Sequence, residues 1–283
     1  MSEHRSSFAS VISFSAGTGS SALCWMVLRG IIPRPKRLLV QYADPGMENS
    51  GSYVYRDMLF DELKKADIPC AIVPGPSLYR DIITLRERSA TRIDSPPYFV
   101  AKANGKRGQL MQKCTQYYKI APMNKHLRQW IRHKYWCRSV RPGMIERWIG
   151  FTADEQMRIK PSRTQYVTFR YPLIELGLSK CDLASWYKSE NIPIPPRSVC
   201  NACFANSVEF YRKMSAERPA DFQQACAVDE TVRDWSQVGV VYPVFVSDTL
   251  KPIREITSDN TDNIKDYHYD LESQACTSGF CFV

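Results

Sequence analysis

The chain has 283 residues, 44% hydrophobic and 24% charged, which is the composition of a soluble globular protein with one large domain and room for an appendage. Its longest apolar runs are far shorter than the ~20 residues of a membrane-spanning helix, and the polar start MSEHRSS lacks the features of a signal peptide, so we expect a cytoplasmic protein with no membrane partner. The formal net charge of +9 favours a polyanionic partner.

The N-terminal part of the chain alternates between strand-like and helix-like segments. We expect strands over 9–15, 37–44 and 70–75, separated by helices over 20–30 and 51–67. In the second helix the spacing of Val54, Met58, Leu59 and Leu63 predicts one buried side. A strand–helix–strand–helix–strand order predicts a parallel sheet with right-handed crossovers.

The regular pattern stops after residue 75. Residues 76–113 are polar and broken by prolines and glycines, so we expect an insertion that can be mobile. The later segments are predicted as a helix over 124–135, a strand over 144–151, a helix start capped by Thr152, a strand within 164–176, helices over 180–191, 206–217 and 219–235, and a strand-like stretch after Gly239.

Together these segments predict an α/β fold with an open, mostly parallel, Rossmann-like sheet. Residues 1–175 would form the nucleotide-binding α/β domain, with a basic insertion around 76–143. Residues 176–283 would form a helical C-terminal region that carries a Cys-x-x-Cys and a cysteine-containing tail.

One long stretch, from Ser95 to Ile145, contains no Asp or Glu. Its cations can bind phosphates and its aromatic rings can stack on bases, which favours a nucleic acid or a nucleotide as partner. The alternative is a solvated basic face whose aromatic residues turn inward. The cations are Lys102, Lys106, Arg107, Lys113, Lys119, Lys125, Arg128, Arg132, Lys134, Arg138 and Arg141, and the aromatic residues are Tyr117, Tyr118, Trp130, Tyr135 and Trp136.

The stretch SFSAGTGS, residues 13–20, lies between the first strand and the first helix. Small residues let the backbone approach an anion, glycine permits turns that aim N–H groups at it, and the helix adds its positive N-terminal end. The candidate phosphate-binding residues are Ser15, Ala16, Gly17, Thr18, Gly19 and Ser20. The stretch lacks the Gly-Lys-Ser/Thr ending of a Walker loop, and by itself it fits an ordinary tight turn equally well.

The second strand ends in ADPGMENSGSY, which places Asp44 at the carboxyl edge of the sheet and Glu48 in the following turn. A phosphate loop followed by A-D-x-G-x-E resembles the PP-loop ATP pyrophosphatase superfamily, in its phosphoadenosine phosphosulfate reductase-like branch. The segments KCTQYYKIAP, WIGFTADE, RYPLIELG and CNAC are similar to segments of that branch and come in the same order. The resemblance runs from about residue 9 to about residue 235.

The resemblance implies a fold of the adenine nucleotide alpha-hydrolase type that binds ATP and Mg²⁺. The family's loop Asp is replaced by Gly19 here. Asp44 and Glu48 are the carboxylates that would hold Mg²⁺ instead. The resemblance also implies catalytic roles for Asp44, Lys119 and Cys114. Further candidate phosphate contacts are Lys160, Arg163 and Arg170.

Ten cysteines in a reducing compartment indicate metal or redox chemistry. The Cys200–Cys203 pair fits a redox pair, half of a zinc site or part of an iron–sulfur site. With Cys114 it would hold a [4Fe–4S] cluster, an arrangement that resembles PP-loop tRNA thiolation enzymes. Zn²⁺ is the alternative and needs a fourth ligand, for which Cys137 and Cys181 are available.

Two further cysteines, Cys276 and Cys281, lie in the C-terminal CTSGFC. They can relay sulfur or close as a disulfide, or they are exposed unreactive thiols. The Glu-Cys-Gly motif of sulfonucleotide reductases is absent. Cys24, Cys70 and Cys226 are expected in the core.

Three functions remain open at this point. The favoured one is ATP-dependent adenylation of a nucleic acid or nucleotide, followed by sulfur transfer from a donor protein. The second is reduction of adenylyl sulfate or its 3′-phospho form by a thiol reductant protein. The third is a nucleotide- or nucleic-acid-binding component that has lost catalysis.

Overall fold

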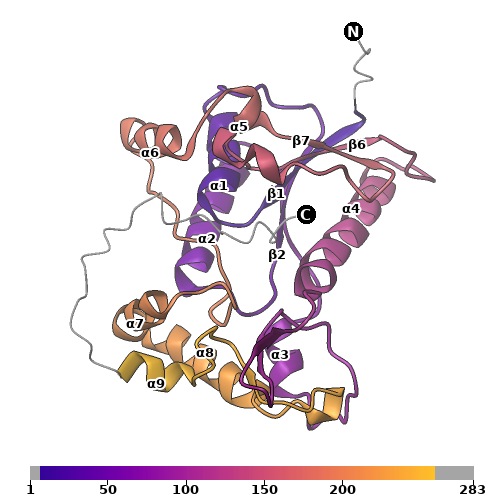
Figure 1. Ribbon diagram of the computed structural model, residues 1–283. Helices are drawn as coiled ribbons and strands as arrows, with labels where there is room; N and C mark the ends of the chain where they lie inside the picture. The colour runs from indigo at the N-terminus through magenta and orange to yellow at the C-terminus, as the bar shows by residue number, and fades with distance from the viewer. Residues whose placement is uncertain (1–6, 259–283) are drawn as a thin grey trace.

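The computed structural model describes residues 7–258. Its centre is a parallel five-stranded sheet with the strand order β3-β2-β1-β6-β7 (Figure 1). This topology confirms the predicted α/β class with an open parallel sheet. The strands are β1 (Ala9–Phe14), β2 (Leu38–Ala43), β3 (Cys70–Val73), β6 (Ile145–Trp148) and β7 (Val167–Arg170).

Alternation along the strands places apolar side chains on both faces of the sheet. Ile12 and Phe14 of β1 belong to the core on one face, whereas Val11 belongs to the core on the other. The first face is covered by α1 (Thr18–Leu28), α2 (Ser50–Lys65), α5 (Pro172–Glu175) and α6 (Lys180–Ser189), and the second face by α4 (Ala121–Lys134).

Helix α4 confirms the predicted inward and outward sides. Leu127 and Ile131 are fully buried against the sheet, while Arg128 and Arg132 are exposed. The helix starts earlier than the prediction because a short π-helix, η1 (Gln116–Ile120), leads directly into it. The prediction for α2 was wrong at one position: Val54 is 72% exposed, whereas Leu59 and Leu63 are fully buried.

A second core lies below the sheet in Figure 1 and joins the insertion to the C-terminal helices. The insertion is not irregular, because Ile82 and Tyr98 pack against Tyr211 and Trp235 in this core. The elements around this second core are α3 (Leu78–Ile83), β4 (Phe99–Ala101) and β5 (Arg107–Gln109) of the insertion. From the C-terminal part come α7 (Val208–Glu217), α8 (Pro219–Val232), η3 (Ser236–Val238), β8 (Val244–Phe245) and α9 (Ile253–Ser258).

The packing does not follow the expected boundary at residue 175. Leu183 and Tyr187 of α6 belong to the core of the sheet, and they come after that boundary. Leu78 and Tyr118, which come before it, pack with the C-terminal helices. Within residues 7–258 the chain therefore passes from the sheet into the second core, returns to the sheet, and enters the second core again.

Candidate functional site

The turn between β1 and α1 is built to hold its backbone open toward solvent. Ala16 adopts a left-handed conformation with a φ of 60°, and Gly17 is the N-cap of α1. The Ser20 hydroxyl accepts the N–H of Ser15 at 3.1 Å and donates to the carbonyl of Gly17 at 3.2 Å. A strained residue and a hydroxyl that fastens the turn are typical of a functional loop.

The first N–H groups of α1 have no partner within the helix, and the helix dipole makes this end positive. Ser15, Gly17, Thr18, Gly19 and Ser20 line a pocket at this end, whereas Ala16 is fully buried and does not. We call this pocket the loop pocket. Five of the six candidate residues thus line one pocket at the start of a helix, and their binding of phosphate stays a prediction.

Gly19 lies against the chain that follows β6. A Cβ atom at position 19 would stand 2.0 Å from the carbonyl oxygen of Gly150. Any side chain here, including an aspartate, would push the two backbones apart. The lack of a side chain at Gly19 therefore allows the turn to pack against Gly150, and the loop has no room for a carboxylate at this position.

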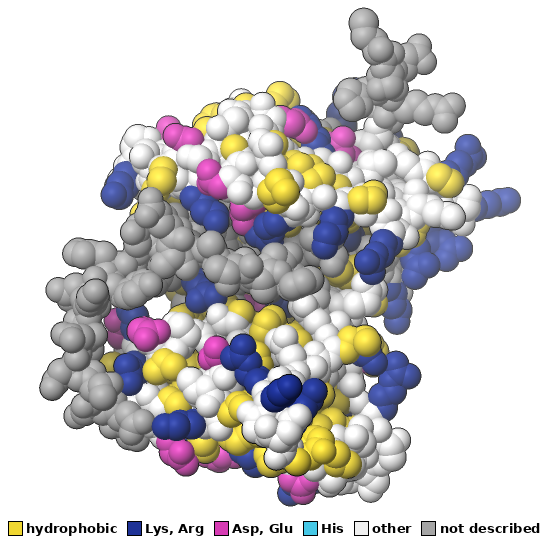
Figure 2. All heavy atoms as spheres, viewed as in Figure 1, with side chains coloured by type: hydrophobic (Ala, Val, Ile, Leu, Met, Phe, Trp, Pro, Cys, Tyr) yellow, Lys and Arg dark blue, Asp and Glu magenta, His cyan; other side chains and the backbone are white. Residues whose placement is uncertain are grey.

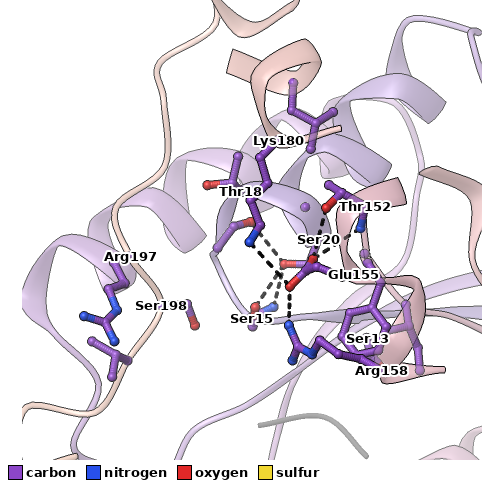
Figure 3. A pocket seen from close by; sticks show the side chains of 17 residues that line it. Ser13, Ser15, Thr18, Ser20, Thr152, Glu155, Arg158, Lys180, Arg197 and Ser198 are labelled. Carbon is purple, nitrogen blue, oxygen red and sulfur yellow. Dashed lines mark hydrogen bonds and ion pairs between the residues drawn. The ribbon is translucent and has the colours of Figure 1, made fainter. Parts of the chain in front are cut away.

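The opposite wall of the loop pocket carries cations that were not among the predicted site residues. Arg158 ends η2 (Ala153–Arg158) and Lys180 begins α6, and both are ion-paired with Glu155, at 4.0 Å for Lys180 (Figure 3). Glu155 also accepts the backbone N–H of Thr152 at 3.2 Å. Arg197 is a third cation in the lining, so the pocket offers backbone N–H groups, three cations and one carboxylate to a ligand.

The positions of Arg158 and Lys180 in the predicted topology could have indicated that they belong to the site. Both follow the carboxyl ends of β6 and β7, where open α/β sheets bind their ligands. The cations proposed from the sequence, Lys160, Arg163 and Arg170, do not line the loop pocket. Arg170 instead pairs with Glu175 at 2.8 Å.

Asp44 and Glu48 also lie outside the lining of the loop pocket. Asp44 accepts the N–H of Gly46 at 2.7 Å and the hydroxyl of Tyr53 at 2.8 Å. Burial and the neighbouring Asp44 carboxylate raise the pKa of the Tyr53 hydroxyl. Glu48 is ion-paired with Lys119 at 2.7 Å, and its side chain is 2% exposed. Among the described residues, the second carboxylate oxygen of Glu48 has no hydrogen-bond partner.

A second pocket, the thiol pocket, is lined by Cys114, Cys200, Cys203 and Lys119. The sequence places these residues far apart, and the structure brings them together. Cys200 forms an isolated β-bridge with Glu48, and its Sγ donates to Glu48 Oε1 at 3.9 Å. Burial raises the pKa of the Cys114 thiol, and burial with the Glu48 carboxylate raises that of Cys200.

The donor set of the thiol pocket fits iron or zinc in type, because thiolates are preferred ligands of both. Within residues 7–258, however, no three Cys, His, Asp or Glu side chains are grouped closely enough to hold a metal ion. A bound cluster would therefore need the three thiols to move closer together. Cys137 donates to the carbonyl of Ser139 at 3.0 Å, and neither it nor Cys181 lines this pocket as a fourth ligand.

Cys24 and Cys226 are buried, as predicted, and Cys70 is partly buried. Cys276 and Cys281 lie outside the described residues, so their expected roles stay predictions.

The two pockets adjoin each other. Ser198 and Val199 line both of them, and the Cβ of Ser198 would lie 3.1 Å from a Cβ on Gly17. The segment between Arg197 and Cys200 thus forms a partition, with the turn before α1 on one side and three thiols on the other.

In the part of the chain that the structure describes, no helix is long and apolar enough to cross a membrane. No model of a known protein family matches the sequence, and no curated protein does either. Among solved structures, the chain is similar to the U34-tRNA thiolase NcsA from Methanococcus maripaludis, solved with its [4Fe-4S] cluster. The likeness covers 90% of this chain and 82% of the thiolase, at 10% sequence identity and a TM-score of 0.40.

Proposed function

We propose that this protein is an enzyme of the PP-loop ATP pyrophosphatase type. It would bind ATP, adenylate an oxygen of a nucleic-acid or nucleotide substrate, and exchange that oxygen for sulfur. The observation that carries the proposal is the partition formed by Ser198 and Val199, which lies between the glycine-rich turn before α1 and three thiols.

The loop pocket would hold the phosphates of ATP. The N–H groups at the start of α1 and the charges of Arg158 and Lys180 would bind them, since both kinds of group bind anions. Glu155 is the carboxylate that lines this pocket, so we assign Mg²⁺ to Glu155 in place of Asp44 and Glu48.

Adenylation turns a poor leaving group into a good one. A substrate oxygen attacks the α-phosphorus of ATP, the bond to the β-phosphate oxygen breaks, and pyrophosphate leaves. A sulfide ion supplied by a donor protein then attacks the substrate carbon; the new C–S bond forms, the C–O bond breaks, and AMP leaves with the oxygen. Arg158 and Lys180 would stabilise the negative charge that develops on the phosphates.

Cys114, Cys200 and Cys203 would hold a [4Fe–4S] cluster, with Zn²⁺ as the alternative. A cluster with three protein ligands supplies an iron that can bind sulfide. Lys119 and Glu48 remain paired beside these thiols, and the Lys119 ammonium opposes the negative charge that thiolates bring into the pocket.

Pyrophosphate release tests the proposal. The protein is incubated with ATP, Mg²⁺ and pooled small RNAs, and Ser20→Ala is compared with Ser185→Ala, an exposed serine of α6. We expect release by the wild type and Ser185→Ala and a loss of at least tenfold in Ser20→Ala. The proposal fails if no substrate elicits release or if Ser20→Ala is as active as its control.

One observation favours a second candidate, reduction of a sulfonucleotide. Because position 19 has no room for a carboxylate, the turn can bind a sulfate or phosphosulfate without splitting ATP. Release of sulfite from adenylyl sulfate or its 3′-phospho form, with thioredoxin as reductant and without pyrophosphate, would establish it. Inactivity in both assays would favour a binding component without catalysis.

A further inference from the structure

The outer side of α4 and the chain after it carry a group of exposed cations. Figure 2 shows Lys and Arg side chains gathered on the right-hand side of the molecule, over this region. Across residues 7–258, none of six exposed cations here makes an ion pair. They are Lys125, Arg128, Arg132, Lys134, Arg138 and Arg141. We call them the α4 cations.

The spacing places several of these charges on one stripe. Lys125, Arg128 and Arg132 are three and four residues apart, so they lie one above another on the helix surface. The guanidinium of Arg132 donates to the carbonyl of Arg138 at 3.3 Å, which holds the following loop against the end of the helix. The stripe therefore continues from the helix into the loop.

The aromatic residues of this stretch differ in their exposure. Tyr118 is buried, and its hydroxyl donates to Asp81. Trp130 packs edge-on against Tyr135, with ring centroids 5.2 Å apart. Two rings are exposed, Tyr117 to 46% and Trp136 to 90%, and Trp136 has a φ of 52°. An indole so exposed, held among cations by a left-handed backbone, gains nothing from packing and is available to a ligand.

We propose that the α4 cations and Trp136 form a binding surface for unpaired nucleotides of a nucleic acid. Phosphates would contact the cations, and a base would stack on Trp136. This inference rests on the proposed function, and it names where that enzyme holds its substrate. A base must be free of its duplex partner to stack on an aromatic ring, so the surface selects single strands or loops.

The surface leads to the thiol pocket. Lys119 lines that pocket and lies in η1, which continues directly into α4. From Lys119 to Lys134, two residues before Trp136, the helical rise amounts to about 22 Å. A mononucleotide cannot span this distance, whereas an oligonucleotide can. An acidic protein or an anionic membrane would use the cations but has no base to place on Trp136.

The test is oligonucleotide binding measured by fluorescence anisotropy. A labelled single-stranded RNA of twelve nucleotides is compared with its duplex and with AMP as competitor, over a range of salt concentrations. The variants are Trp136→Ala and the double variant Arg128→Gln/Arg132→Gln. The control, Lys64→Gln/Lys65→Gln, removes the same charge from the exposed end of α2.

We expect the wild type to prefer the single strand to the duplex and AMP to compete poorly. Trp136→Ala should weaken single-strand binding about tenfold and leave the salt dependence unchanged. The double arginine variant should lower the slope of log K against log salt by about 1.4, which corresponds to two phosphate contacts. The lysine control should bind like the wild type.

Three results would overturn the inference: equal binding of single strand and duplex, no effect of Trp136→Ala, or tighter binding to vesicles of anionic phospholipid than to the RNA. ATP binding is measured on the same samples. A wild-type protein that binds ATP but not the RNA refutes this surface alone, whereas a wild-type protein that binds the RNA without releasing pyrophosphate refutes the proposed function alone.

Discussion

The contact between Gly19 and Gly150 predicts a large effect from one methyl group. In Gly19→Ala the new Cβ would stand 2.0 Å from the Gly150 carbonyl oxygen, and real Cβ contacts are longer than 3.0 Å. The two backbones must therefore separate by about 1 Å, and overpacking of this kind costs roughly 1–3 kcal/mol. Because the turn is also the floor of the loop pocket, its displacement should weaken ATP binding about tenfold or more.

Gly51→Ala is the matched control. Gly51 is also the second residue of a helix, and its added Cβ would meet only side-chain atoms, 3.3 Å away or more. Its free energy of unfolding should stay constant or rise by up to about 1 kcal/mol. Denaturant unfolding and ATP calorimetry measure both variants. The reasoning is refuted if Gly19→Ala is as stable as Gly51→Ala and binds ATP like the wild type.

Three further variants test the charges of the site. Lys119→Met should destabilise the fold by about 3–5 kcal/mol because it leaves Glu48 buried without its cation. Denaturant unfolding should show that the double variant Lys119→Met/Glu48→Gln recovers much of this loss. No recovery would contradict the pairing of Lys119 with Glu48. Glu155→Gln should abolish the strengthening of ATP binding by Mg²⁺, as read by calorimetry with and without EDTA; unchanged Mg²⁺ dependence would remove Glu155 as its ligand. Burial lowers the pKa of His126 in the folded state, so protonation favours the unfolded chain and stability should fall as the pH drops from 7.5 to 5.5. Urea unfolding at the two pH values should show a smaller loss of stability in His126→Gln than in the wild type. An equal loss in both proteins would show that His126 is not responsible.

The sheet was predictable because its signals are local. Each strand is a short apolar run bounded by turn residues, and each helix between strands has its own periodicity. The second core was not predictable in this way. Tyr98 and Trp235 are close in space, with ring centroids 6.0 Å apart, but more than a hundred residues apart in sequence. Residues 76–113 have turn-rich composition, and only packing against the C-terminal helices gives them regular structure.

The candidate site was predictable where a backbone feature marks it. The turn at Gly17 and the Cys200–Cys203 pair both have local sequence signals. The roles of single charged residues were harder to foresee. Arg158 and Lys180 face the loop pocket because of where β6 and β7 end, and the sequence does not distinguish them from other cations nearby. Asp44 was expected to hold Mg²⁺, but the structure engages it with Tyr53 and Gly46.

The central claim is that a nucleotide in the loop pocket lies beside the three thiols, across the partition at Ser198 and Val199. Alkylation of Cys114, Cys200 and Cys203 by iodoacetamide, followed by mass spectrometry with and without ATP, measures this directly. We predict that ATP slows alkylation of these three thiols, leaves the exposed Cys181 unchanged, and has no effect in Ser20→Ala. Equal alkylation of the three thiols with and without saturating ATP would contradict the claim.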